Sequence, residues 1–181
     1  MVDVLRSMPE KGVRFQLAHT SDAKTLAQLR KQIRLETYRG IYPDETLDQY
    51  DFLKNIENFS TQITEGHQQL WLIMKGEEAI GYFGVGEPIY WYPDHTDRNE
   101  LFLNSMYLCK QYWRKGIGKA AMKFIMQLAK SQGKKMLYNN CNMHNRNAVA
   151  FYRACGGVEI YSEGGHENPA EDQMTFEYKI E

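Results

Sequence analysis

Apolar residues in the first third of the chain follow two different spacings, and each spacing predicts a kind of element. The run VRFQLA at residues 13–18 is short and rich in apolar residues, which predicts a strand. Residues 19–38 carry apolar side chains every three or four positions, which predicts a helix. After a turn at residues 39–45 the helical spacing returns and predicts a second helix from Leu47 to about Thr64.

The rest of the chain changes spacing at glycines and prolines. Two apolar runs around a Lys-Gly-Glu-Glu turn predict a hairpin, whereas the segment PIYWYPDHTDRN that follows is too irregular for a strand. The expected elements are a hairpin at 68–87, strands at 100–109, 134–142, 158–163 and 172–181, and helices at 116–132 and 145–155. Their order, β-α-α-β-β-β-α-β-α-β-β, predicts a mixed sheet with helices on it, a layered domain of the α/β or α+β class.

Length, charge and the lack of long apolar runs narrow the possible functions. The 181 residues suffice for one domain with a core, so residues 1–181 are expected to form a single domain. The formal net charge of -1 gives no general reason to expect nucleic-acid binding, and no apolar run is long enough to cross a membrane. The N-terminal stretch lacks an apolar signal region and the cysteines are odd in number, so we expect reduced thiols and a cytoplasmic protein.

A glycine-rich turn precedes one of the predicted helices. In the stretch CKQYWRKGIGKAAMKF, Gly116 and Gly118 are flanked by Arg114, Lys115 and Lys119. Unpaired N–H groups at a helix N-terminus attract anions, and glycines let a phosphate approach the backbone, so the turn is a candidate phosphate site. A tight turn with solvated lysines explains the same residues equally well, because a Gly-x-Gly pair is a weak signal.

Two known phosphate-binding motifs can be compared with this turn. The P-loop pattern fails, because Gly118-Lys119 is followed by Ala120 instead of Ser or Thr. The dinucleotide pattern Gly-x-Gly-x-x-Gly/Ala is met in form by Gly116, Gly118 and Ala121. The next strand, LYNNCN, has no acidic residue for a ribose, so a nicotinamide-dependent enzyme is a minor alternative.

A zinc site is a second minor alternative. Cys141 and His144 stand close together in the sequence, with Cys155 and His166 further along. Structural zinc needs four convergent ligands and usually closer pairs, so no metal is expected. A strand cysteine beside a loop histidine is the simpler interpretation.

Two stretches, in order along the chain, resemble the GNAT superfamily of N-acetyltransferases. LNSMYLCKQYWRKGIGKAAM is similar to the family's acetyl-CoA signature, and NRNAVAFYRACGG is similar to its second signature, Asn-x-x-Ala-x-x-Phe-Tyr followed by a glycine. The resemblance implies a mostly antiparallel central sheet of about seven strands, flanked by about four helices and splayed at the central strands. Trp113 and Gly157 depart from the family pattern, which often has Gln or Arg at the first place and usually Phe at the second.

The resemblance also implies a role for each part of the two signatures. The backbone around Leu108 binds the acetyl carbonyl and the pantetheine amides, the glycine turn binds the pyrophosphate, and Tyr152 protonates the leaving thiolate. A helix cap is the simpler alternative for Asn145, and core packing is the simpler alternative for Tyr152. The residues implied to bind acetyl-CoA are Leu108, Cys109, Lys110, Trp113, Arg114, Lys115, Gly116, Ile117, Gly118, Lys119, Asn145 and Tyr152.

The general base and the acceptor are specified less closely. Glu100, at the start of the central strand, is one candidate base, directly or through a water, and His95 is another. A solvated surface position is the alternative for each. The resemblance implies an acceptor pocket between the first two helices and an aromatic loop, and it favours a polyamine or another small amine, with a protein N-terminus or lysine next. The residues expected to bind the acceptor are Glu36, Tyr38, Tyr42, Tyr90 and Trp91, with negative charge from Glu36, Asp44, Glu45 and Asp94.

The sequence therefore allows three classes of function. The first is an enzyme that transfers acetyl from acetyl-CoA to a primary amine by direct attack through a tetrahedral intermediate, with a small molecule as its partner. The second is a non-catalytic module that binds an acyl-CoA, and the third is the nicotinamide oxidoreductase. Tyr152 favours the first class, because binding alone does not need an acid. The resemblance is compatible with a homodimer.

Overall fold

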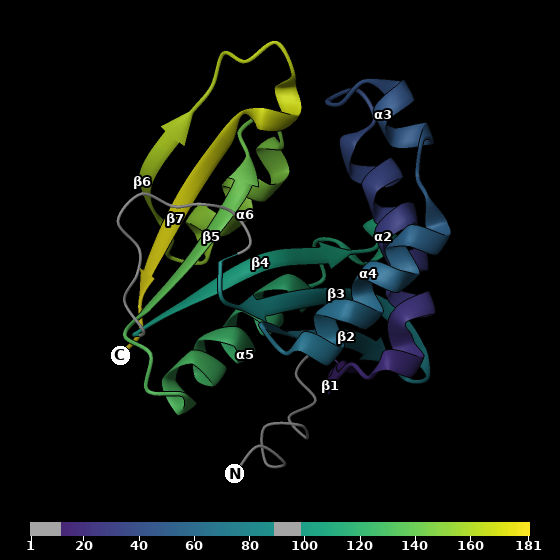
Figure 1. Cartoon of the computed structure of the whole chain (residues 1–181). Coiled ribbons are helices and arrows are strands. Elements are labelled where there is room, and N and C mark those ends of the chain that lie inside the picture. Colours follow the sequence, from purple (N-terminus) through teal and green to yellow (C-terminus); the bar gives the residue numbers. More distant parts are fainter. Residues whose placement is uncertain (1–11, 89–98) are drawn as a thin grey trace.

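The computed structural model describes residues 12–88 and 99–181 (Figure 1). The strands are β1 (Arg14–Leu17), β2 (Gln68–Lys75), β3 (Glu78–Gly86), β4 (Glu100–Leu108), β5 (Met136–Asn142), β6 (Val158–Glu163) and β7 (Gln173–Lys179). The α-helices are α2 (Ala23–Tyr38), α3 (Asp44–Asp48), α4 (Phe52–Glu65), α5 (Ile117–Ser131) and α6 (Arg146–Ala154). Short 3-10 turns lie at Thr20–Asp22, Lys110–Tyr112 and Pro169–Glu171. No helix in either described range combines the length and the apolar character needed to cross a membrane.

The strands form one sheet in the order β1-β2-β3-β4-β5-β7-β6. Neighbouring strands are antiparallel except β4 and β5, which are parallel. Helices α5 and α6 cover one face of the sheet, and α2 and α4 cover part of the other (Figure 1). Each face therefore has its own apolar core, and the predicted mixed sheet with flanking helices is confirmed.

The second predicted helix is wrong in one respect, because it is broken into α3 and α4. Asp51 begins α4, since its Oδ1 accepts the Lys54 N–H at 2.9 Å as an N-cap does. The Tyr50 hydroxyl donates to the Ala27 carbonyl at 2.9 Å and so ties the break to α2. Leu53 fits the predicted apolar stripe but is 77% exposed. A local cap and a tertiary hydrogen bond thus override the helical spacing.

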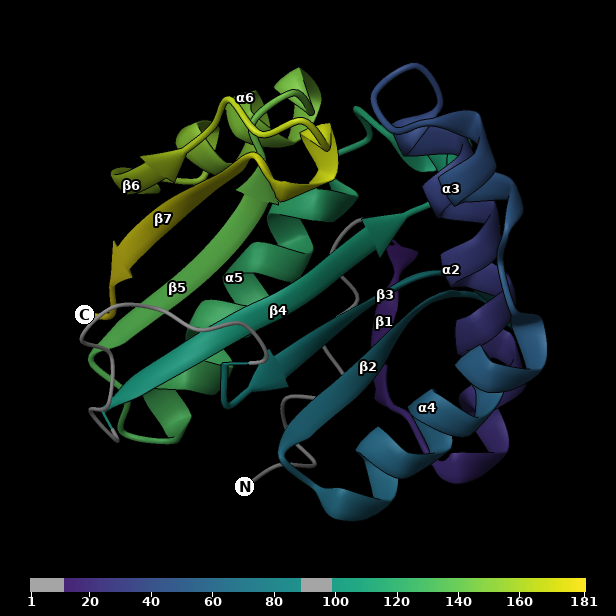
Figure 2. The same ribbon diagram turned by 45° about the horizontal axis from the view of Figure 1, so that its top comes forward.

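The central strands β4 and β5 separate along their length, as the resemblance implied. They pair only from Glu100 to Leu103 on β4, opposite Met136 to Asn139 on β5. Beyond that point the two strands diverge toward their C-terminal ends (Figure 2). The register between β3 and β4 shifts at the same place, leaving Asn104 as the extra residue of a bulge. A bulge bends its strand, so the divergence begins where β4 changes direction.

Candidate active site between the diverging strands

A cavity of about 570 Å³ opens where β4 and β5 diverge. Helices α2 and α6 and the start of α5 complete its walls. The residues that line it are Ile33, Thr37, Tyr38, Leu103, Asn104, Ser105, Met106, Tyr107, Leu108, Trp113, Arg114, Gly116, Gly118, Lys119, Asn140, Cys141, Asn145, Asn147, Ala148, Ala150, Phe151, Tyr152 and Ala154. Both stretches that the sequence analysis singled out therefore meet at one cavity.

The end of β4 directs main-chain polar groups into this cavity. The Cys109 N–H donates to the Ile80 carbonyl at 3.0 Å, which makes these residues a hydrogen-bonded antiparallel pair. Hydrogen-bonded and non-hydrogen-bonded pairs alternate along an antiparallel ladder. Leu108 and Met106, opposite Gly81 and Phe83, are therefore in non-hydrogen-bonded pairs. Their N–H and C=O groups therefore point away from β3 and toward the space that β5 vacates.

Gly81 sets how closely β3 approaches this part of β4. A Cβ at Gly81 would lie 2.3 Å from the Tyr107 carbonyl oxygen and 3.1 Å from the Leu108 Cα. Both of these are main-chain atoms, which cannot move aside as the end of a side chain can. The position of the Leu108 backbone thus depends on a glycine in the neighbouring strand.

The start of α5 presents a second group of main-chain donors to the cavity. Gly116 is the N-cap, with a φ of 81° and no side-chain cap. The first hydrogen bond of the helix runs from the Ala120 N–H to the Gly116 carbonyl at 3.0 Å. The N–H groups of residues 117–119 precede that bond and point out of the helix, where they suit an anion. Lys119 adds positive charge beside them.

Two residues of the glycine turn have unusual surroundings. Arg114 has a φ of 60°, and within the described ranges it is the one non-glycine residue with a positive φ. That conformation costs a residue with a Cβ about 1 kcal/mol or more and is typical of functional turns. Gly118 lies against α6, because a Cβ there would be 2.9 Å from the Phe151 ring. Gly118 therefore also lets the start of α5 pack closely against Phe151 of α6.

Tyr152 reaches the cavity from α6 and is 7% exposed. Burial raises the pKa of its hydroxyl well above the ordinary value, with smaller contributions from Cys141 and Tyr178. The phenol is therefore fully protonated near neutral pH and can donate a proton. Its ring packs on Phe151 and Phe176 at centroid distances of 5.2 and 5.9 Å, which fixes its direction.

Asn145 connects the start of α6 with α2 across the cavity. Its Oδ1 accepts the Ala148 N–H at 3.1 Å, so the predicted helix cap is confirmed. Its side chain also lies near the Tyr38 hydroxyl, where it lowers the pKa of that group and partly offsets the effect of burial. Burial raises the pKa of Tyr38 far above the usual range, and Tyr107, Tyr42 and Tyr152 add to the shift. Tyrosine side chains from three elements therefore surround one part of the cavity.

Several residues expected to bind acetyl-CoA lie outside the lining. The Cys109 side chain points into the core beneath α2 and α4, and burial raises the pKa of its thiol to about 11. Ile117 is buried in the core beneath α5. Lys110 is exposed, and the Lys115 ammonium lies 5.4 Å from the centre of the Tyr112 ring. These four residues therefore do not line the cavity.

The structure does not bring Glu100 together with Tyr152. Glu100 begins β4, and at about 3.3 Å per residue the strand separates it from Leu108 by roughly 26 Å. Its carboxylate hydrogen-bonds the Tyr138 hydroxyl. The expectation that Glu100 is the base is therefore not supported. His95, the alternative base, lies outside the described residues, as do Tyr90, Trp91 and Asp94. No described residue of the lining carries a carboxylate or an imidazole.

The carboxylates expected to attract the acceptor have other contacts. Glu36 accepts the Lys110 N–H at 2.8 Å and the Gln32 side-chain amide at 2.8 Å. Asp44 pairs with the Arg39 guanidinium at 2.9 Å. Glu45 is exposed in the first turn of α3, whereas Tyr42 stacks on Tyr38 at 4.4 Å. Of the described residues expected to bind the acceptor, Tyr38 lines the cavity itself.

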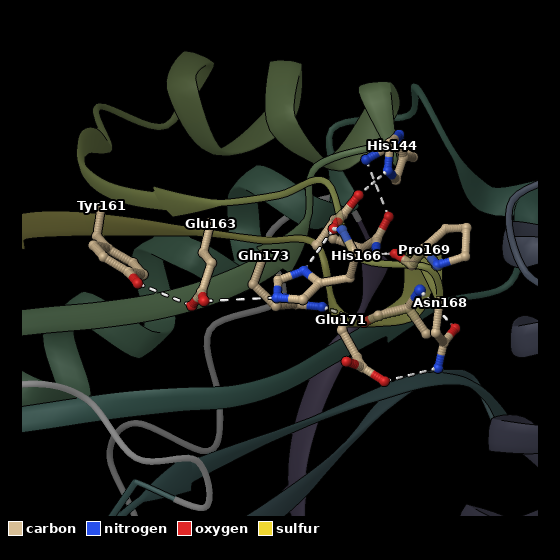
Figure 3. A network of polar contacts seen from close by, with 11 residues as sticks. His144, Tyr161, Glu163, His166, Asn168, Pro169, Glu171 and Gln173 are labelled. Carbon is tan, nitrogen blue, oxygen red and sulfur yellow. Dashed lines mark hydrogen bonds and ion pairs between the residues drawn. The ribbon is translucent and has the colours of Figure 1, made fainter.

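A polar network beside the cavity was not predicted from the sequence (Figure 3). Asp172, at the start of β7, has a side chain only 6% exposed. It accepts hydrogen bonds from His144 Nε2 at 2.7 Å, from His166 Nδ1 at 2.8 Å and from the His166 N–H at 3.0 Å. These bonds hold the pKa of Asp172 far below its usual range, and the bond to Asp172 raises the pKa of His166.

The same network joins the β5–α6 connection to the loop between β6 and β7. Asn142 is 3% exposed, its Nδ2 donates to the Pro169 carbonyl at 2.6 Å, and its Oδ1 accepts the His144 N–H at 3.0 Å. The Met143 N–H donates to the Asp172 carbonyl at 3.0 Å. Both histidines of the alternative zinc set thus contact Asp172 instead of a cysteine. Neither histidine had a sequence signal that linked it to Asp172.

A family model places most of this fold among known proteins. The model for the acetyltransferase (GNAT) family matches residues 29–157. The matched range includes the diverging strands, the glycine turn, Asn145 and Tyr152.

Solved structures of similar proteins cover nearly the whole chain. PaiA N-acetyltransferase from Thermoplasma acidophilum, in complex with coenzyme A, has a TM-score of 0.70 at 19% identity over 92% of this chain and 98% of that chain. A chimera of spermidine N-acetyltransferase SpeG from Vibrio cholerae and hSSAT has a TM-score of 0.70 at 14% identity over 93% and 96%. YncA, a putative acetyltransferase from Salmonella typhimurium with acetyl-CoA, has a TM-score of 0.68 at 15% identity over 94% and 95%. At these identities the likeness is one of fold.

Proposed function

Because this chain belongs to the acetyltransferase (GNAT) family, it is an acetyl-CoA-dependent acyltransferase, and we propose that it acetylates the primary amine of a small molecule, with polyamines favoured. Two of its structural neighbours are a PaiA N-acetyltransferase and a spermidine N-acetyltransferase chimera. The cavity between the diverging strands is the proposed site of transfer.

The orientation of the Met106 and Leu108 main chain is the observation that carries the proposal. The Met106 N–H and C=O and the Leu108 N–H face the vacated side of β4, so an extended arm with amide groups pairs there as a strand would. The pantetheine arm of acetyl-CoA has such amides. At the end of this row the Leu108 N–H donates to the thioester oxygen and stabilises the negative charge that develops during attack.

The glycine turn supports the same orientation of the co-substrate. The free N–H groups of residues 117–119 lie beyond the end of β4, together with Arg114 and Lys119. Main-chain donors at a helix N-terminus suit a pyrophosphate, and the two cations offset its charge. The proposed path therefore runs from Leu108 past Gly116 toward Lys119.

Tyr152 is the proposed general acid. As the amine nitrogen attacks, the new C–N bond forms and the C–S bond breaks, which leaves a thiolate that needs a proton. The buried phenol of Tyr152 supplies that proton and regains one from the nitrogen or from solvent. Because burial raises the pKa of this hydroxyl, it keeps its proton at neutral pH and is available as a donor.

The acceptor side is aromatic in the described part of the chain. Tyr38, Tyr107 and Tyr152 line the cavity, and no described lining residue is acidic. Ring faces attract a cationic amine. The described lining carries no carboxylate or imidazole, so water or His95, the candidate base outside the described residues, is proposed to take the ammonium proton before attack.

Release of free thiol from acetyl-CoA tests the proposal. Purified full-length chain is mixed with acetyl-CoA and, in parallel, spermidine, spermine, an aminoglycoside, single amino acids and a lysine peptide. We expect release with the polyamines. Release with the peptide alone would replace the small-molecule acceptor by a protein. No release with any amine, from folded protein that binds acetyl-CoA, would favour the binding module.

A further inference from the structure

The segment from Leu108 to Gly116 connects the strand that faces the thioester to the helix that faces the pyrophosphate. We call residues 108–116 the connecting segment. Its two ends line the cavity, whereas its middle forms the turn Lys110–Tyr112. Any change in the shape of this segment would alter the spacing between the two main-chain sites. The contacts that stabilise this segment are therefore expected to affect the binding of acetyl-CoA as well as folding.

Trp113 closes the connecting segment upon itself. The indole Nε1–H donates to the Leu108 carbonyl at 2.7 Å, in a half-buried position. Leu108 and Trp113 both line the cavity. The bond lies on the side of β4 that faces away from β3, because the Leu108 C=O points in that direction. A side chain that departs from the family pattern thus contacts the main chain of the proposed oxyanion donor.

The Leu108–Cys109 peptide group is consequently held from both sides. On one side the Cys109 N–H donates to the Ile80 carbonyl at 3.0 Å. On the other side the Leu108 C=O accepts the Trp113 indole. The peptide is planar, so fixing both of its polar groups fixes its rotation. The Leu108 N–H belongs to the preceding peptide group, and because Leu108 is extended in β4, this N–H points to the same side as the Leu108 C=O.

Glu36 braces the connecting segment from α2. Its Oε2 accepts the Lys110 N–H at 2.8 Å, across 74 residues of sequence. Its Oε1 accepts the Gln32 side-chain amide, one turn earlier on the same helix, at 2.8 Å. Gln32 thus orients the Glu36 carboxylate, and the carboxylate binds the Lys110 N–H. These bonds are solvent-exposed, so their contribution is smaller than that of the half-buried indole bond.

We propose that Trp113 is a positioning residue that, together with the Glu36 bond to the Lys110 N–H, holds the Leu108 peptide in the orientation needed to bind the thioester. The inference rests on the proposed site for acetyl-CoA. Neither side chain reacts with a substrate, and each acts through the main chain of the connecting segment. The Trp113 departure from the family pattern then replaces a polar side chain by an internal hydrogen bond.

Direct binding of acetyl-CoA to the full chain, measured by calorimetry without any acceptor, tests this inference. Trp113→Phe keeps an aromatic ring but removes the N–H, so we expect the Kd to rise about three- to tenfold. In turnover the KM for acetyl-CoA should rise while the KM for the amine stays unchanged. Glu36→Ala should raise the Kd about threefold, and Glu36→Gln should restore it, because an amide oxygen still accepts the Lys110 N–H.

Trp71→Phe is the matched control. The Trp71 indole nitrogen is buried without a hydrogen-bond partner in the described structure, and its ring packs in the α5 core. This variant should lose stability but keep the Kd for acetyl-CoA. An unchanged Kd in Trp113→Phe would overturn the positioning role, and a lower Kd would show that the indole competes with the pantetheine arm. Absence of acetyl-CoA binding in the unaltered protein would instead overturn the proposed site itself.

Discussion

The two sides of the cavity are built in different ways. On the side of β4 and α5, main-chain N–H and C=O groups face the cavity, and Gly81 and Gly116 help to set their positions. Behind the side formed by α6, buried side chains such as Asp172 and Asn142, which do not line the cavity, join the β5–α6 connection to the β6–β7 loop. The first side depends on backbone geometry, whereas the second depends on charge and protonation. Mutations and pH should therefore affect them separately.

Replacing Tyr152 should have the largest effect, because Tyr152 is the proposed catalytic side chain at the boundary of the two sides. Tyr152→Phe keeps the buried ring but removes the acid, so we expect kcat to fall about 100-fold or more. The Kd for acetyl-CoA should change by less than about twofold, since main-chain groups carry the binding. Tyr161→Phe, at an exposed hydroxyl on β6, should leave both values unchanged. Equal loss of kcat and affinity in Tyr152→Phe would remove the acid assignment.

Gly81→Ala is expected to have the next largest effect, and it disturbs only the main-chain side. The added methyl meets a main-chain oxygen at 2.3 Å, so β4 must shift. We expect a loss of about 1–3 kcal/mol in the free energy of unfolding and weaker binding of acetyl-CoA.

Gly84→Ala on the same strand is the matched control for Gly81→Ala. Its methyl would meet side-chain atoms instead of main-chain atoms, those of Gln68 and Leu70 at 2.9 Å and of Ser105 at 3.1 Å. Urea titration and calorimetry of both variants provide the comparison. Equal effects of the two substitutions would show that the Leu108 backbone does not depend on Gly81.

Asp172→Asn should disturb the other side alone. The substitution keeps the shape but removes the charge that His144 and His166 contact, and it leaves the network with weaker bonds. We expect a lower melting temperature and a higher KM for the amine, with an unchanged Kd for acetyl-CoA. Glu171→Gln, an exposed neighbour, is the control. Weaker acetyl-CoA binding in Asp172→Asn would show that the two sides are coupled.

The pH dependence of stability should give the smallest effect. The raised pKa of His166 contributes stability that is present below about pH 6.5, its unfolded value, and is lost as pH rises through the folded value. The lowered pKa of Asp172 contributes stability that is present above about pH 3.9 and is lost as pH falls further. Melting temperatures from pH 3 to 9 should therefore be highest between these limits. Asp172→Asn should flatten the profile, and an unaltered profile would contradict the role of the network.

The sequence predicted the main-chain side better than the side-chain network. Apolar spacing located the strands and helices, and Gly116 and Gly118 marked the turn. Both are readable because the local backbone conformation restricts which residue types occur at neighbouring positions. Contacts between distant residues leave no such trace. Asp172 reads as the first residue of a strand, and its partner His144 is 28 residues away. Glu100 was expected to act as a base because of its strand, but the strand's length takes it away from the cavity.

The break in the second predicted helix and the glycine at position 157 also depend on contacts between distant residues. The predicted helix through Tyr50 is interrupted because that side chain bonds to α2, which no spacing rule contains. The Gly157 departure from the family pattern also has a tertiary reason. A Cβ there would lie 2.8 Å from the Tyr178 hydroxyl, which donates to Asn139 at 2.9 Å in the core. Tyr178 fills the space beside that glycine.

The divergence of β4 and β5 gives the sheet an internal edge in addition to its outer ones. An exposed edge is a hazard, since its free N–H and C=O groups can capture a strand of another molecule. Here the edge lies between α2 on one side and α6 on the other, within a cavity of about 570 Å³. A slender arm can enter such a space, but a folded protein's strand cannot. The enclosing helices thus let the protein keep unpaired backbone groups ready for a ligand without inviting aggregation.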